Sequence, residues 1–267
     1  LLAAADTAEP LAELLERLET GRPSGFLASQ LGRRLAQAYH GGVGSLMGMD
    51  LHAVLEAAAP DGASGAGEHL ERLGVSDAST LVVEYHSEES GGALTASLDF
   101  SSPRRGVAAW LAPPAPMGSL EFVSPDATFA AAAVAKDATD LFDEVLELMG
   151  SDGALAEGLE TLHREHGIDL RADLAATLGG EATVALDGAL LPVPAVKVVI
   201  EVYDPETLQR TIEWAVAEAN RELESRGLAP ILLITEELSG QVYHRMRHPA
   251  LPAALTYTVV DGYLVLA

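Results

Sequence analysis

The chain has 267 residues, with 40 acidic against 16 basic side chains and a formal net charge of −24. A surface this negative repels nucleic-acid phosphates and anionic lipid headgroups, so neither is an expected partner. The sequence has no cysteine, which excludes disulfides, thiolate metal sites and cysteine nucleophiles. Its apolar runs are too short to span a bilayer, so no membrane span is expected in this segment.

Two helices are predicted before the first strand. Leucines at helical spacing mark the first, from Pro10 to Leu18. Ser24 can cap the second, which ends at Gly41-Gly42. Each helix has an apolar face that needs a sheet or another helix to cover it.

A pattern of apolar extended stretch, aspartate and amphipathic helix then occurs three times. The aspartates are Asp50, Asp137 and Asp204. An aspartate in this position accepts hydrogen bonds from the free amides of the first helical turn. The third occurrence is the clearest, because Pro205 takes the first helical position, where its missing N–H costs nothing. We therefore predict that each aspartate caps a helix directly after a strand.

Hairpins lie between these strand–helix units. Residues 81–86 and 93–100 are predicted to form one hairpin. Apolar residues alternate with polar ones along its second strand, which predicts one buried and one solvent-exposed face. Asp261-Gly262 joins the last two strands in a two-residue turn. The predicted fold class is α+β, with mainly antiparallel sheets covered on one face by helices.

The segment 102–126 is stiff and extended, because its prolines exclude a central strand and a helix interior. It predicts two α+β modules, residues 1–118 and 119–267, packed against each other. Trp110 with Arg104 and Arg105 could form a docking groove in this segment. The favoured interpretation is that Trp110 fills the core between the two modules.

Three segments carry a resemblance to other proteins: 104–127, with RRGVAAWLAPPAPMG followed by EFVSPDA, then 178–192 and 198–205. They resemble an uncharacterised bacterial family, a domain of unknown function associated with cell-envelope proteins. The similarity extends from about Gly25 to the C-terminus. The resemblance implies an exported protein of the periplasm or cell envelope that is longer than this chain. It implies no catalytic residues.

One spacing is typical of metal ligands: Glu160, His163 and His166 lie three residues apart and share one face of a predicted helix. The alternative is that the two histidines are polar residues near a helix C-terminus, where imidazolium suits the helix dipole.

His244, Arg245, Arg247 and His248 form the main basic cluster. On a strand, Arg245 and Arg247 would share one face while His244 and His248 take the other. The arginines could bind an acidic group of a partner. We expect them to pair with carboxylates of the same chain, which are present at high effective concentration.

No nucleophile, base and orienting acid can be assigned together, so an enzyme is the less favoured interpretation. The favoured one is a non-catalytic envelope protein with a binding or scaffolding role, for a protein partner or an apolar small ligand, without a cofactor. The alternative is a metal-assisted hydrolase that uses Glu160, His163 and His166. The sequence does not indicate the ligand or the oligomeric state.

Overall fold

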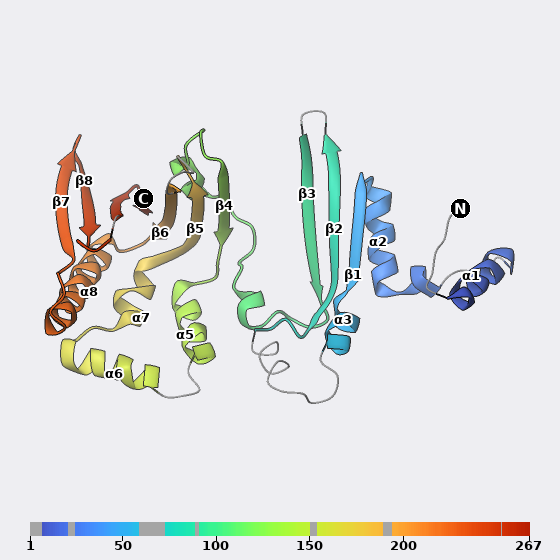
Figure 1. Cartoon of the computed structure of the whole chain (residues 1–267), viewed down its shortest axis with the longest axis horizontal. Helices are drawn as coiled ribbons and strands as arrows, with labels where there is room; N and C mark the ends of the chain where they lie inside the picture. Colours follow the sequence, from blue (N-terminus) through green and yellow to red (C-terminus); the bar gives the residue numbers. More distant parts are fainter. Residues whose placement is uncertain are drawn as a thin grey trace. The chain divides into compact units, whose positions relative to one another are not determined.

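The computed structural model describes residues 7–20, 25–58, 73–88, 91–149, 154–188, 194–251 and 253–267. These residues form seven α-helices and two antiparallel sheets, which confirms the predicted α+β class (Figure 1). The chain divides into two compact units, residues 1–109 and 110–267. None of the described helices is both long and apolar enough to cross a membrane.

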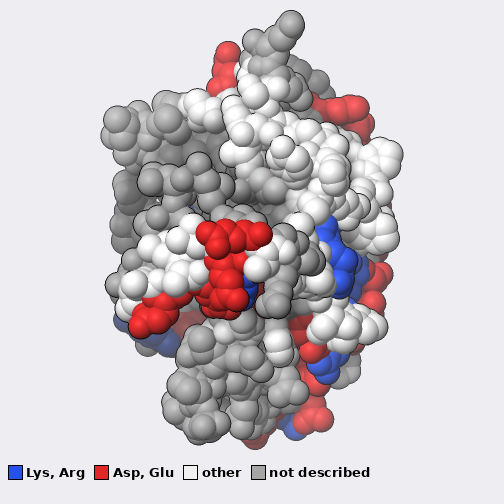
Figure 2. Space-filling view, turned by 90° about the vertical axis from the view of Figure 1, so that its right-hand side faces the viewer, with Lys and Arg blue, Asp and Glu red and all other residues white. Residues whose placement is uncertain are grey.

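The first unit is a three-stranded sheet with the order β1-β2-β3 and with α2 against β1 and β2. Gly48 of β1 lets α2 approach closely, since a Cβ there would lie 2.6 Å from a methyl group of Leu35. Figure 2 views the chain from the right-hand side of Figure 1 and shows separate groups of acidic side chains on that face. The elements of the unit are α1 (Ala8–Thr20), η1 (Gly25–Ala28), α2 (Gln30–Gly41), β1 (Ser45–Asp50), α3 (Leu51–Ala58), β2 (Ala78–Glu88), β3 (Gly91–Phe100) and η2 (Gly106–Ala109).

The apolar side of β3 differs from its prediction. Leu94 and Leu98 are 71% and 44% exposed, although their alternation with polar residues predicts a buried face. Tyr85, the cross-strand partner of Leu94, is also exposed. The sequence pattern therefore identified which residues share a face but not whether the face is covered.

The second unit is built on a seven-stranded sheet with the order β4-β5-β6-β10-β9-β8-β7. Every neighbouring pair of strands is antiparallel. Its elements are η3 (Gly118–Phe122), β4 (Phe129–Val134), α5 (Ala138–Met149), α6 (Ala154–His166), α7 (Leu170–Asp173), η5 (Ala175–Thr177), β5 (Leu178–Leu186), β6 (Val196–Val202), α8 (Pro205–Ser225), β7 (Leu232–Leu238), β8 (Gln241–Arg247), β9 (Ala254–Val260) and β10 (Tyr263–Leu266).

The two faces of this sheet are covered differently. On one face, Leu208 of α8 packs against Tyr257 and Leu264 in the hydrophobic core. On the other face, the short turn η3 contacts β5 and β6, and its Ser119 is completely buried. The helical face therefore holds the apolar core, while the η3 face holds a buried polar cluster.

All three predicted aspartate caps are confirmed. Asp50 accepts from the Ala53 amide at 3.1 Å, Asp137 from the Thr139 amide at 2.8 Å and Asp204 from the Thr207 amide at 3.0 Å. Asp50 is also the last residue of β1, so there the strand passes into the helix without a connecting residue.

Replacing Asp204 by alanine should lower the free energy of unfolding of the second unit by about 0.5 to 2 kcal/mol, because the Thr207 amide loses its acceptor. Both tryptophans of the chain lie in this unit, so their fluorescence during urea unfolding reports on it. Asp204→Asn keeps a side-chain acceptor and should recover most of the loss. An unchanged midpoint for the alanine variant would contradict the capping role.

The boundary between the units falls between Ala109 and Trp110, inside the predicted stiff segment and before residue 118. Packing of the two modules against each other stays a prediction. Trp110 is half-buried rather than buried, and its indole N–H donates to Glu144 of α5 at 2.8 Å. The Trp110 carbonyl accepts from the Lys136 amide at 2.8 Å, and the Ala112 amide donates to the Val134 carbonyl at 2.9 Å. This stretch therefore covers the end of the free edge of β4.

Replacing Trp110 by alanine should cost the second unit about 2 to 3 kcal/mol, less than the full loss expected for a buried tryptophan. The variant loses the packing of a half-buried ring and a hydrogen bond to Glu144. Trp110→Phe keeps most of the ring and should cost only about 1 kcal/mol. Urea unfolding followed by Trp214 fluorescence measures both, and equal losses in the two variants would show that the ring contributes nothing.

Candidate functional site

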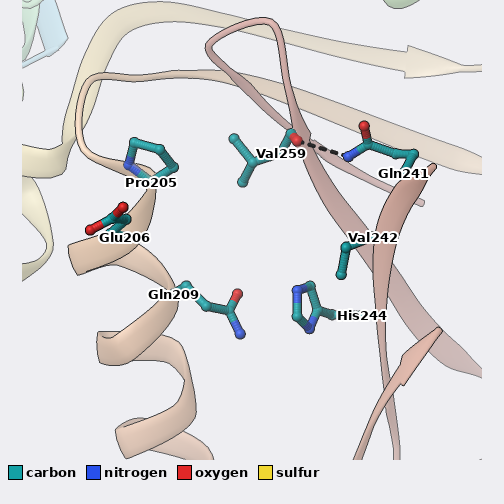
Figure 3. A pocket seen from close by; sticks show the side chains of 7 residues that line it. All are labelled: Pro205, Glu206, Gln209, Gln241, Val242, His244 and Val259. Carbon is teal, nitrogen blue, oxygen red and sulfur yellow. Dashed lines mark hydrogen bonds between the residues drawn. The ribbon is translucent and has the colours of Figure 1, made fainter. Parts of the chain in front are cut away.

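A cavity of about 390 Å³ opens on the helical face of the second sheet (Figure 3). Its volume falls within the range of small-molecule binding sites. The start of α8 forms one wall, and β8 and β9 form the other. Seven residues line it: Pro205, Glu206, Gln209, Gln241, Val242, His244 and Val259.

Local sequence rules place these side chains. The Asp-Pro start fixes the first residue of α8, and Glu206 and Gln209, three residues apart, then lie on one side of the helix. Val242 and His244 alternate with outward residues along β8 and so face the same side of the sheet. The Gln209 side-chain oxygen accepts a hydrogen bond from the Tyr257 hydroxyl at 3.1 Å.

His244 is held from two sides. Its ring stacks on Tyr257, with the ring centroids 4.9 Å apart and the planes at 17°. Its Nδ1 lies 3.2 Å from the Thr235 hydroxyl. Burial raises the pKa of Tyr257, so its hydroxyl remains a donor to Gln209. The stacking and the contact with Thr235 therefore fix the orientation of the imidazole.

Both side-chain amides of the cavity donate hydrogen bonds within the protein. Gln209 donates to Glu213 at 2.8 Å, and Gln241 donates to Thr258 and to the Val259 carbonyl. Within the described residues, the Gln241 side-chain oxygen and the Glu206 carboxylate have no hydrogen bond. The polar groups offered to a ligand thus include these two acceptors, set against apolar Val242, Val259 and Pro205.

The charge of the site favours a cation or a neutral donor over an anion. A free helix N-terminus attracts anions, but the Asp204 side chain already occupies an amide of α8. Hydrogen bonds from Thr207 lower the pKa of Asp204, so this group stays ionised at neutral pH. Glu206 adds a second carboxylate in the same turn.

The predicted basic cluster is divided by the strand. His244 faces the cavity, while Arg245 and Arg247 are exposed on the opposite face. His248 lies beyond β8, with Nε2 2.9 Å from the Ala229 carbonyl and Nδ1 accepting from the Ala250 amide. The expectation that the two arginines pair with carboxylates of the chain is wrong for the described residues, where neither has an ion pair or hydrogen bond.

Two of the three residues proposed for a docking groove, Arg105 and Trp110, have partners within their own units. Arg105 donates to Asp77 at 2.7 Å, and hydrogen bonds from Ser102 and Arg105 lower the pKa of Asp77. Arg104 is exposed. Trp110 donates to Glu144, whose pKa is lowered chiefly by its hydrogen bond with Lys136.

Glu160, His163 and His166 do not assemble into a metal site. Glu160 and His163 are exposed on α6, whereas His166 turns to α8. There its ring lies 5.8 Å from that of Trp214, and its Nδ1 lies 3.9 Å from Glu218. The described part of the chain contains no cluster of three or more histidine or acidic side chains that could hold a metal ion.

A buried polar cluster on the η3 face was not anticipated from the sequence. Glu181 of β5 is 7% exposed and accepts from the Ser119 amide at 2.7 Å and from the Tyr263 hydroxyl at 2.9 Å. The Ser119 hydroxyl also lies 2.6 Å from that of Thr183. Both partners in each of these hydrogen bonds belong to the protein, so the cluster holds η3 against the sheet.

A second carboxylate holds the chain just after η3. Asp187 accepts from Lys197 and from the hydroxyl and amide of Ser124. Its hydrogen bonds, with that from Lys197 the largest, lower the pKa of Asp187 from 3.8 to about 2. The carboxylate therefore stays ionised well into the acid range.

The contribution of Asp187 to stability should fade in acid. Because its folded-state pKa is lowered, the stabilisation is complete above pH 3.8 and is lost as the pH falls towards about 2. The difference in urea midpoint between the wild type and Asp187→Asn should therefore be constant near neutral pH and shrink over that window. Asp126→Asn, at an exposed carboxylate in the loop that contains Ser124, serves as the control. A difference that does not change with pH would contradict the ion pair.

Comparisons of the chain with protein-family models, with curated proteins and with solved structures found no match.

Proposed function

We propose that this chain is a non-catalytic binding protein and that its second unit takes a small ligand in the α8–β8–β9 cavity. The observation that carries the proposal is the combination of a volume of about 390 Å³, an apolar lining and polar groups without partners at one site. Binding sites for small molecules combine these features.

The chemistry of the lining supports a ligand with an apolar body and a hydrogen-bond donor or cationic head. The body would lie on Val242, Val259 and Pro205. An ammonium or hydroxyl group would donate to Glu206 and to the Gln241 oxygen. The second unit has 25 acidic and nine basic side chains, so its field also favours a cation.

A binding role is preferred to catalysis because His244 lacks the surroundings of a general base. Thr235 is its hydrogen-bonding neighbour, and no carboxylate of the described residues orients the ring.

The resemblance to a cell-envelope family supports a location in the bacterial periplasm or envelope. Fractionation of cells that express the full gene, probed with an antibody to this segment, tests the location separately.

Calorimetric titration with three probes of one shape tests the ligand class. They are 2-phenylethylamine, 2-phenylethanol and phenylacetate, which place a cation, a neutral donor or an anion on the same ring. The amine should bind most tightly and the acid least. Glu206→Gln should weaken amine binding about tenfold, because a hydrogen bond to a charged group is lost.

Glu224→Gln is the matched control, because it removes the same charge from an exposed position in the last turn of α8. It should leave amine binding unchanged. Equal binding of the three probes, or equal losses in the two variants, would exclude the proposed site. If none of the three probes binds, this ligand class is excluded.

A further inference from the structure

A second hollow lies on the opposite face of the same strands. It measures about 160 Å³ and is lined by Glu236 and Leu238 of β7, Tyr243 and Arg245 of β8 and Thr256 of β9. Arg245 pairs with Thr256 across one strand boundary and with Ile234 across the other, so all five side chains belong to one face. Since His244 and Met246 point to α8, this face is the one that η3 covers only at β5 and β6.

The arginine of this hollow differs from most cations of its unit. Among the described residues, seven of the nine lysines and arginines of the second unit have a hydrogen-bond or ion-pair partner, and the two without one there are Arg245 and Arg247. The seven with partners are Lys136, Arg164, Arg171, Lys197, Arg210, Arg221 and Arg226. In a unit with 25 acidic side chains, a guanidinium group without a partner is unexpected.

A carboxylate is nonetheless close by. Glu236 lies opposite Tyr243, and Arg245 lies opposite Ile234, so Glu236 and Arg245 are diagonal neighbours on one face. Long side chains can bridge this diagonal. The two line the same hollow, yet no ion pair joins them. The hollow therefore presents one positive and one negative group with space between them.

We infer that this hollow binds a zwitterion of amino-acid size. The ligand carboxylate would bind the planar guanidinium group of Arg245, whose paired N–H groups match the geometry of a carboxylate. The ligand ammonium group would donate hydrogen bonds to the Glu236 carboxylate. An apolar ligand side chain would lie against Leu238 and Tyr243, and the Thr256 hydroxyl offers one further hydrogen bond.

The size and polarity of the hollow favour this ligand over larger or singly charged ones. A volume of 160 Å³ corresponds to about five water molecules, which suits an amino acid rather than a peptide of several residues. A simple anion would be repelled by Glu236, and a simple cation would be repelled by Arg245. A zwitterion satisfies both groups and adds no net charge to an acidic protein. This site is independent of the α8–β8–β9 cavity.

Calorimetric titration of the whole chain with leucine tests the inference. Leucine should bind, while N-acetyl-leucine and leucinamide, which each lack one of the two charges, should bind about tenfold more weakly. Arg245→Gln and Glu236→Gln should each weaken leucine binding by a similar factor.

The chain provides a matched control for each variant. Arg247 has the same strand, face and lack of partner but does not line the hollow, so Arg247→Gln should leave leucine binding unchanged. Glu237 follows Glu236 on the other face and controls for the acidic variant. Equal weakening by Arg245→Gln and Arg247→Gln would overturn the site, as would equal binding of leucinamide or no leucine binding at millimolar concentration. Glu206→Gln should not change leucine binding, which separates this result from the proposed function.

Discussion

Replacing Glu181 by alanine should cost the second unit about 3 kcal/mol of unfolding free energy. Glu181 is 7% exposed, and its carboxylate accepts from Ser119 and Tyr263. Alanine would leave the Tyr263 hydroxyl and the Ser119 amide buried or half-buried without their acceptor. Leaving donors unsatisfied in this way costs more than a typical intact hydrogen bond contributes.

The ionisation of this cluster gives the prediction a pH signature. Burial acts to raise the pKa of Glu181, but hydrogen bonds from Ser119 and Tyr263 outweigh it and hold the pKa below its usual value of 4.5. Burial and the neighbouring Glu181 raise the pKa of Tyr263 to about 12, so the hydroxyl stays a donor. The stabilisation by Glu181 is therefore present above pH 4.5 and is lost as the pH falls below it.

Tryptophan fluorescence during urea unfolding measures the loss, because both tryptophans lie in this unit. Glu181→Gln retains an acceptor oxygen without the charge and should cost about 1 to 2 kcal/mol. Glu121→Ala, at an exposed position within η3, should change stability by less than about 0.5 kcal/mol. Similar losses for Glu181→Ala and Glu121→Ala would show that the buried cluster does not hold η3 to the sheet.

Features that depend on neighbouring residues could be predicted from the sequence. The aspartate caps at Asp50, Asp137 and Asp204 require only a side chain and the amides two or three residues ahead. The last turn is equally local, because Asp261 and Gly262 adopt φ of 50° and 81° between β9 and β10.

Features that depend on distant pairing could not be predicted. β10 lies between β6 and β9, so a strand at the end of the chain completes the middle of the sheet. Ser119 and Glu181 are 62 residues apart in the sequence, and no spacing rule relates them. The same limit applies to the candidate site: the sequence singles out His244, but Glu206 and Gln209 lie beside it only because α8 crosses that face of the sheet.

The interpretation of the basic run shows where sequence reasoning was partly right. Alternation along a strand separated His244 from Arg245 and Arg247, as the structure shows. The expected pairing of the arginines rested on the abundance of carboxylates, and abundance does not determine geometry. Glu236 shares the hollow with Arg245 without reaching it.

Replacing Gly74 by alanine should destabilise the first unit by at least about 3 kcal/mol. Gly74 has a φ of +73°, a conformation that costs an alanine about 1 to 2 kcal/mol. A Cβ at this position would also lie 1.7 Å from the carbonyl oxygen of Arg105, far inside contact distance. That oxygen belongs to the backbone, so the two segments of chain must move apart before the methyl group fits.

A second glycine separates the two contributions. Gly42, at the end of α2, has a φ of +81° but nothing within 4 Å of the Cβ position. Gly42→Ala in the same unit should therefore cost only the conformational part, about 1 to 2 kcal/mol. Far-UV circular dichroism during urea unfolding compares the two variants, because the tryptophans do not report on this unit. If Gly74→Ala lost no more than Gly42→Ala, the close approach between Gly74 and Arg105 would not contribute to the stability of the unit.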